Sequence, residues 1–138
     1  MNSDPVLPAE EVRYATLQVG DAIVRAEVVD TDSARQKGLS GRERLPEGAG
    51  MLFVFPGADT YGIWMKDMLF PIDIIWLNAD LRVVHVVEEA TPESYPTAFR
   101  PRLSAQYVLE VPAGFSARYG IQVGQEFVMR DEGAAPSL

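Results

Sequence analysis

The sequence predicts a mainly β domain of the α+β class, in which a mostly antiparallel sheet forms a small barrel-like fold with two short helices. Short β-prone segments alternate with turn residues, neighbouring segments are joined by tight reversals, and regular βαβ alternation is absent. The 138 residues suit one domain. We expect this domain over residues 12–130, after a flexible lead-in at 1–11 and before a disordered tail at 131–138.

The first elements are predicted to be a hairpin and a short helix. Residues 12–19 and 22–29 are both β-prone, and the Gly20-Asp21 pair between them suits a tight turn. The helix is expected to run from a cap at Asp30-Thr31 to about Lys37, because a glycine that suits the C′ position follows it.

A buried strand comes next. Residues 51–55 are continuously apolar, which is typical of a strand buried on both faces, and Pro56 is expected to end it. The second helix is expected from Pro112 to Tyr119, before a glycine. The proline-rich residues 90–101 predict a long loop. Five further short strands are expected at residues 63–67, 72–77, 81–88, 106–111 and 125–130. The reversal at Asn78-Ala79-Asp80 predicts that the strands at 72–77 and 81–88 form a second hairpin.

The charge balance disfavours several partners. The chain has 20 acidic and 12 basic residues, a formal charge of −8, and no run of basic residues. Because nucleic-acid affinity depends on neutralising phosphates, we expect no nucleic-acid partner. The longest uncharged stretch, residues 48–58, is too short for a spanning helix, so membrane insertion is not expected either.

The common cofactor and catalytic motifs are missing. The chain has no cysteine and one histidine, His85, so it offers no metal-ligand cluster of the usual kinds. It has no glycine-rich phosphate-binding motif and no Gly-x-Ser-x-Gly nucleophile elbow. We therefore expect no metal and no cofactor, and we interpret His85 as a partly buried structural residue.

Several segments, in their order and spacing, carry a family resemblance. They are GLSGR (38–42), GMLFVF (50–55), IWMKDM (63–68), PIDIIWL (71–77) and YVLEVPAG (107–114). Over roughly residues 22–128 the chain resembles the family catalogued as domain of unknown function 192. This resemblance implies a compact β-barrel-like domain and no established activity. Many relatives carry an export signal, so it also implies a periplasmic or extracellular location. The chain departs from the common pattern at Asp67-Met68, where Asn-Thr is frequent, and at Ser40, where Met is frequent.

Five residues are candidates for a site. Trp64 and Lys66 lie two apart in a predicted strand and share a face, and an indole beside an ammonium can bind a saccharide or a planar anion. Alternatively, the indole packs in the core and the lysine extends past it to water. Asp73 interrupts an apolar strand, where a carboxylate needs partners. Those partners are either Arg42 and Lys66 at a cleft, or a structural ion pair or backbone donors. Glu110 faces away from its apolar neighbours and is either exposed or part of the pocket floor.

Three functions remain open from the sequence. The first is a non-enzymatic ligand-binding or accessory domain of the cell envelope. It would bind a saccharide or small anionic ligand through Arg42, Trp64, Lys66, Asp73 and Glu110. The second is a small hydrolase or isomerase that uses Asp73, Glu110 and Lys66 as acid and base. The third is a protein-interaction module that docks a partner through Tyr95, Phe99 and the proline-rich loop.

Overall fold

The structure is a computed structural model that describes residues 12–134. The expected lead-in and the last four residues of the expected tail lie outside the described residues. The helices are α1 (Asp32–Lys37), a 3₁₀ turn (Pro92–Ser94) and α2 (Phe115–Tyr119). The strands are β1 (Arg13–Val19), β2 (Ala22–Val29), β3 (Ala49–Asp59), β4 (Ile63–Trp64), β5 (Ile72–Leu77), β6 (Val83–Ala90), β7 (Ala98–Phe99), β8 (Ala105–Pro112) and β9 (Val128–Ala134).

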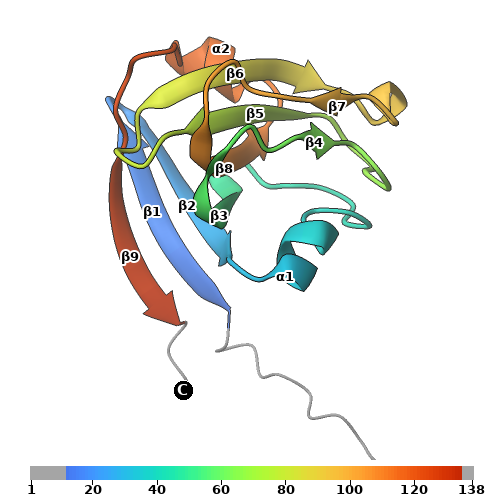
Figure 1. The fold of residues 1–138 in the computed structure, drawn as a ribbon, viewed down its shortest axis with the longest axis horizontal. Coiled ribbons are helices and arrows are strands. Elements are labelled where there is room, and N and C mark those ends of the chain that lie inside the picture. The colour runs from blue at the N-terminus through green and yellow to red at the C-terminus, as the bar shows by residue number, and fades with distance from the viewer. Residues whose placement is uncertain (1–11, 135–138) are drawn as a thin grey trace, which may run out of the picture.

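The principal sheet is mixed and open (Figure 1). Its seven strands follow the order β6-β5-β8-β3-β2-β1-β9, and β4 and β7 form a separate two-stranded ribbon. The predicted β-rich class with two short helices is confirmed, but the predicted barrel closure is wrong. The edge strands β6 and β9 do not pair with each other. Instead, the segment before β9 hydrogen bonds beside β6, from Val83 N–H to the Gln125 carbonyl at 2.8 Å.

One connection makes the sheet mixed. β2 pairs with β3 in parallel, from Arg25 opposite Ala49 to Val29 opposite Phe53. The chain leaves β2 through α1 and a loop, so it enters β3 from the same end of the sheet. Thr31 caps α1 by accepting a hydrogen bond from Ala34 N–H at 3.2 Å, as the sequence predicts.

Both predicted hairpins form, but several boundaries differ from expectation. The second helix begins at Phe115 rather than at Pro112, because Pro112 is the last residue of β8. β1 pairs with β2 across the Gly20-Asp21 turn, and β5 pairs with β6. β3 continues through Pro56 to Asp59, because pairing with β8 is already irregular beyond Val54 and the missing N–H breaks no regular ladder. β9 continues to Ala134, into the expected tail, where Asp131 accepts from Arg13 at 2.9 Å. The strand expected at residues 63–67 ends at Trp64.

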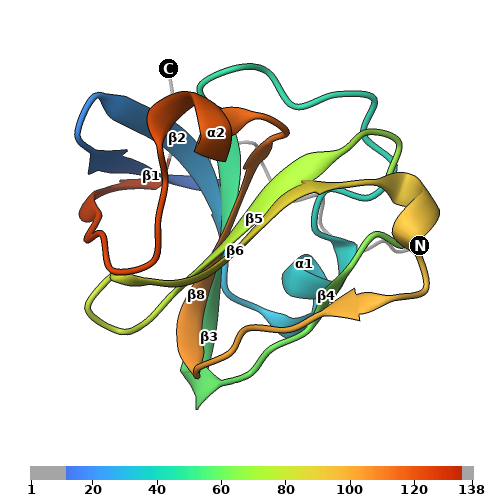
Figure 2. The same cartoon turned by 90° about the horizontal axis from the view of Figure 1, so that it is seen from above.

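Different elements cover the two faces of the sheet, with α2 on one side and α1 and β4 on the other (Figure 2). Each face carries its own apolar cluster. The outer cluster lies under α2 and the segment before β9, and Leu109 and Val111 of β8 point into it. The inner cluster faces α1 and the β4–β7 ribbon, and Val108 of the same strand points into it. Because side chains alternate along a strand, β5 and β8 each send neighbouring residues to opposite faces. This alternation decides where the two buried carboxyl groups lie.

Candidate functional site

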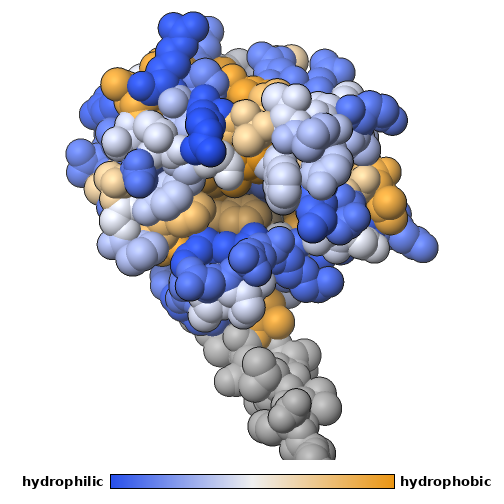
Figure 3. All heavy atoms as spheres, turned by 45° about the vertical axis from the view of Figure 1, so that its right-hand side comes forward, coloured by the Kyte–Doolittle hydropathy of each residue, from blue (hydrophilic) through white to orange (hydrophobic). Residues whose placement is uncertain are grey.

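A cavity of about 830 Å³ opens on the inner face of the sheet. Its walls come from α1 and the turn that follows it, from β3, and from the chain around β4. Figure 3 shows a hollow on this side of the molecule, with hydrophobic atoms at its floor and a hydrophilic rim. A volume of this size falls within the range of small-molecule sites in proteins.

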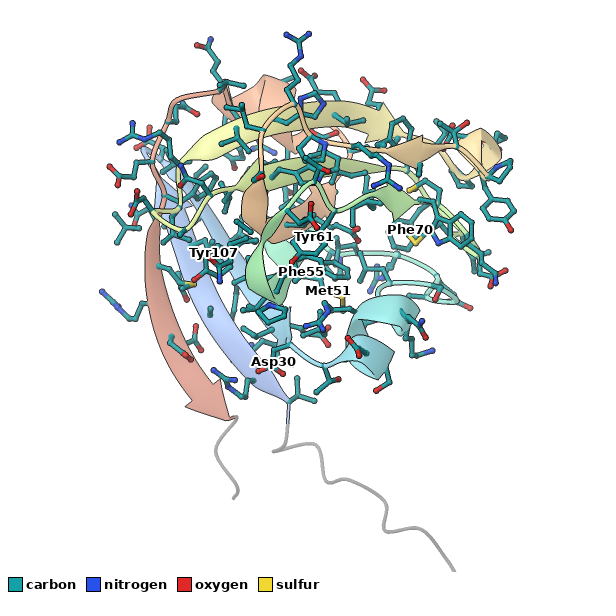
Figure 4. All side chains as sticks on the ribbon, in the orientation of Figure 1. Asp30, Met51, Phe55, Tyr61, Phe70 and Tyr107 are labelled. Atoms are coloured by element: carbon teal, nitrogen blue, oxygen red, sulfur yellow. The ribbon has the colours of Figure 1, made fainter. Side chains whose placement is uncertain are left out.

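The inner walls are apolar and partly aromatic. Phe53, Met65 and Ile72 line the cavity and are almost fully buried. Phe55 stacks on Tyr61 with ring centroids 3.7 Å apart and an interplanar angle of 11°. Figure 4 shows these two rings lying together between the sheet and α1. The segment that carries Tyr61 is held by Trp76, whose indole N–H donates to the Tyr61 carbonyl at 2.9 Å.

Arg35 fixes α1 as the opposite wall. Its guanidinium donates to the Val54 carbonyl at 2.7 Å and to Asp32 Oδ1 at 2.7 Å. The guanidinium carbon also lies 5.1 Å from the centroid of the Phe55 ring, within cation–π range. A helix of only six residues is marginally stable by itself, so these contacts of Arg35 help to hold α1 in place.

Glu110 lies at the floor of the cavity without a partner. Its exposed fraction is 4%, and its carboxyl group makes no hydrogen bond or ion pair with any residue between 12 and 134. Burial disfavours the charged form and raises the pKa of Glu110 to about 8. At neutral pH this carboxyl is mostly protonated, and it can both donate and accept a hydrogen bond.

The mouth of the cavity carries Trp64 and Lys66. The indole of Trp64 is 49% exposed, and its ring lies 5.0 Å from that of Tyr95 with an interplanar angle of 56°. The Lys66 ammonium lies 5.8 Å from the indole centroid and makes no ion pair within the described part of the chain. The pair expected from the i, i+2 spacing therefore does line one cavity, although Lys66 lies in a turn rather than in a strand.

Asp73 lies on the other face of the sheet, opposite Val111 of the outer cluster. Its carboxylate is fully buried and accepts hydrogen bonds from the backbone N–H groups of Ser116 at 2.7 Å, Glu89 at 2.8 Å and Gly114 at 3.3 Å. This is the alternative in which the aspartate binds backbone donors. The expectation that Asp73 joins a cluster with Lys66 is wrong, because residue 73 has the opposite strand parity to the cavity-lining Ile72.

Arg42 is also absent from the cavity. Its guanidinium binds both carboxylate oxygens of Glu27, at 2.5 and 3.1 Å, in a shallow depression beside β2. The hydrogen bonds to Glu27 raise the pKa of Arg42. The predicted convergence of Arg42, Trp64, Lys66 and Asp73 is therefore wrong. Of the five sequence candidates, Trp64, Lys66 and Glu110 meet at the cavity.

The remaining candidates have structural surroundings. His85 packs against Trp76 with ring centroids 5.3 Å apart, and burial, with a smaller contribution from Arg102, lowers the pKa of His85. Phe99 packs against the inner cluster, whereas Tyr95 is exposed beside Trp64. Over residues 12–134, no group of three His, Cys, Asp or Glu side chains could hold a metal ion. No helix in that range is long and apolar enough to cross a membrane.

Comparisons with known proteins place the chain in a family. The model of the domain of unknown function 192 family, described as "Uncharacterized ACR", matches residues 15–129. The chain belongs to this family. No curated protein matches this member of it.

Two crystal structures are similar to this family member. One, from Sinorhizobium meliloti 1021, is of a protein described as a candidate transcription regulator. It is 26% identical with a TM-score of 0.78, and the match covers 86% of this chain and 93% of that one. The other, a protein of unknown function from Novosphingobium aromaticivorans DSM 12444, is 26% identical with a TM-score of 0.77. That match covers 91% of this chain and 99% of that one.

Asp67 and Met68, where the family resemblance led us to expect Asn-Thr, line the cavity wall. Asp67 has a left-handed φ of 59°, a conformation in which aspartate and asparagine are both enriched. Its carbonyl accepts from Gly41 N–H at 2.9 Å, which ties the two cavity-lining loops together. Aspartate therefore keeps the backbone geometry that asparagine would give, while Met68 adds an apolar side chain to the wall.

Sequence reasoning missed the α1 wall of the cavity. Arg35 and Lys37 were expected only as helix residues, yet both line the cavity. Phe55 was expected only as the end of a buried strand. The sequence between the short helix and the apolar strand was the only signal for this wall. No local pattern indicated that a cavity would separate the helix from the sheet.

Proposed function

We propose that this protein is a small-ligand-binding domain and that its site is the cavity between α1 and β4. The observation that supports this most strongly is the buried, unpartnered carboxyl of Glu110 at the cavity floor. A ligand that supplies the missing hydrogen-bond partner meets this carboxyl among apolar walls, where a hydrogen bond is stronger than in water. Trp64 and Lys66 at the mouth add a ring face and a cation.

Two rival functions have less support. The acid/base enzyme needed Asp73 and Glu110 within reach of one substrate, but the two groups lie on opposite faces of the sheet. One similar structure is described as a candidate transcription regulator. We do not extend DNA binding to this chain, because a formal charge of −8 disfavours phosphate contacts.

Tryptophan fluorescence provides a direct test. The chain has two tryptophans, of which Trp76 is fully buried and Trp64 is half exposed, so iodide quenching reports on Trp64. We would screen saccharides, carboxylates, amines and amphipathic fragments by ligand-observed NMR. Hits are expected to protect Trp64 from iodide and to raise the melting temperature.

A matched pair of variants localises the binding. Trp64→Ala should weaken each hit, whereas Tyr119→Ala, which removes a partly exposed ring at the end of α2, should leave binding unchanged. Hits that bind equally well to both variants and never protect Trp64 would place the site elsewhere. A screen with no hit at millimolar concentration would overturn the proposal.

A further inference from the structure

The two ends of the cavity carry unpaired groups of opposite kind. At the floor, the Glu110 carboxyl has no donor and no cation among the described residues. At the mouth, the Lys66 ammonium lies 5.8 Å from the centroid of the Trp64 ring, and no carboxylate of residues 12–134 lies within ion-pair distance of it. Both groups line one cavity, so one molecule can contact both.

The other charged groups of the rim do not cancel this polarity. Arg35 is neutralised by Asp32 at 2.7 Å. That leaves Lys37 and Asp67, one of each sign, neither of which makes a side-chain ion pair in the described residues. The rim is therefore cationic by one charge, counting Lys37, Lys66 and Arg35 against Asp32 and Asp67.

The space between the two ends is apolar. Phe53, Phe55 and Met65 line it, and the carboxyl of Glu110 is the ionisable group of the buried floor. A ligand rich in hydroxyl groups would leave most of them unpaired against these walls, at a cost for each. An apolar body with few polar groups loses less on entering.

We infer that the cavity selects dipolar ligands, which place a hydrogen-bond donor against Glu110 and an anionic group beside Lys66, with an apolar body between them. This inference rests on the proposed function and narrows its ligand class. A carboxylate entering first would meet an acidic floor, whereas an amine or hydroxyl finds an acceptor there. In the reverse orientation, an amino group of the ligand would lie beside the Lys66 ammonium, and the two like charges would repel each other.

The protonation of Glu110 separates the two kinds of donor. An ammonium binds best to the ionised carboxylate, so at neutral pH its binding expels a proton from Glu110 into solvent. A hydroxyl can bind the protonated carboxyl and expels none. Calorimetry in two buffers of different ionisation enthalpy measures this difference directly.

The test uses ω-amino acids and ω-hydroxy acids with three to six carbons, together with hexanoate and hexylamine as parents that each lack one end. We expect one chain length to bind about tenfold or more tightly than either parent, which corresponds to about 1.4 kcal/mol. Glu110→Leu, which removes the acceptor that glutamine would keep, and Lys66→Met should each reduce that compound to the affinity of a parent. Arg42→Ala is the matched control and should change nothing.

The outcomes separate this inference from the proposed function. Parents that bind as well as the dipolar compounds, or variants that leave the preference intact, would overturn the dipolar class. Tight binding of saccharides alone at Trp64 would also overturn it and leave the proposed function standing. Because Lys66 is exposed, Lys66→Met is expected to fold even where a floor variant does not.

Discussion

The two carboxyl groups that are buried within residues 12–134 lie in neighbouring strands and have opposite surroundings. Asp73 in β5 faces the outer cluster and accepts three backbone hydrogen bonds. Glu110 in β8 faces the inner cavity and accepts none from the described residues. Both are almost fully buried, so burial alone does not distinguish a structural carboxyl from one available to a ligand. The supply of donors distinguishes them.

Local backbone irregularity explains the difference in donors. Asp73 lies where the β5–β6 register shifts, beside Glu89 with its φ of 54° and opposite the start of α2, so free N–H groups point at it. Glu110 is flanked by regular pairings, with Met51 on one side and Ile74 on the other. In a regular ladder the backbone N–H groups bind neighbouring strands and none is left for a side chain.

Replacing Asp73 should have the largest effect. Asp73→Ala leaves three N–H groups in the interior without acceptors, and at about 1–2 kcal/mol each we expect a loss of about 4 kcal/mol in the free energy of unfolding. Urea denaturation measures this. Asp73→Asn retains one acceptor oxygen and should lose less. A loss under about 1 kcal/mol for Asp73→Ala would show that the three bonds are not structural.

The pH dependence of stability should reveal Glu110. Its pKa is about 8 in the folded state and near the ordinary 4.5 in the unfolded state, so between these values the folded protein binds more protons. Stability from this group is therefore complete below about pH 4.5 and is lost as the pH rises through about 8. Between pH 6 and 9 we expect the wild type to lose about 3 kcal/mol more than Glu110→Gln.

Comparing the wild type with Glu110→Gln isolates the contribution of the Glu110 carboxyl to the pH dependence. Every other titrating residue is shared, so the difference of their pH profiles belongs to position 110. Parallel profiles would mean that the carboxyl is not desolvated, and the cavity floor would then be wetter than its 4% exposure implies.

The same two residues show how far sequence reasoning reached. Local patterning predicted both strands and identified Asp73 as unusual in an apolar strand, whereas Glu110 was interpreted as either exposed or part of a pocket floor. It did not say which face would be filled and which hollow. That depends on where α1 stands relative to the sheet, and Arg35 determines this through a hydrogen bond to Val54 across 19 positions of sequence. The prediction of barrel closure was wrong for a similar reason, because closure depends on whether two edge strands that are distant in sequence pair with each other.

A smaller effect is expected at the loop that closes the cavity wall. Asp67→Val places a β-branched side chain at a φ of 59°, which should cost about 1–2 kcal/mol, while Asp67→Asn should be neutral. Thermal unfolding of the two variants measures the strain. Equal losses in both would point to the carboxylate charge rather than to the backbone.

The smallest effect concerns Arg42, which was predicted from the sequence to lie at the site. Arg42→Ala breaks the bidentate bond to Glu27, but the arginine side chain is 37% exposed, so water screens the pair and we expect about 0.5 kcal/mol at most. Ligand binding at Trp64 should not change, because Arg42 lines a different depression. Lower ligand affinity in this variant would show that the depression around Arg42 influences the cavity. The Arg42–Glu27 pair would then affect the site although it does not line the cavity.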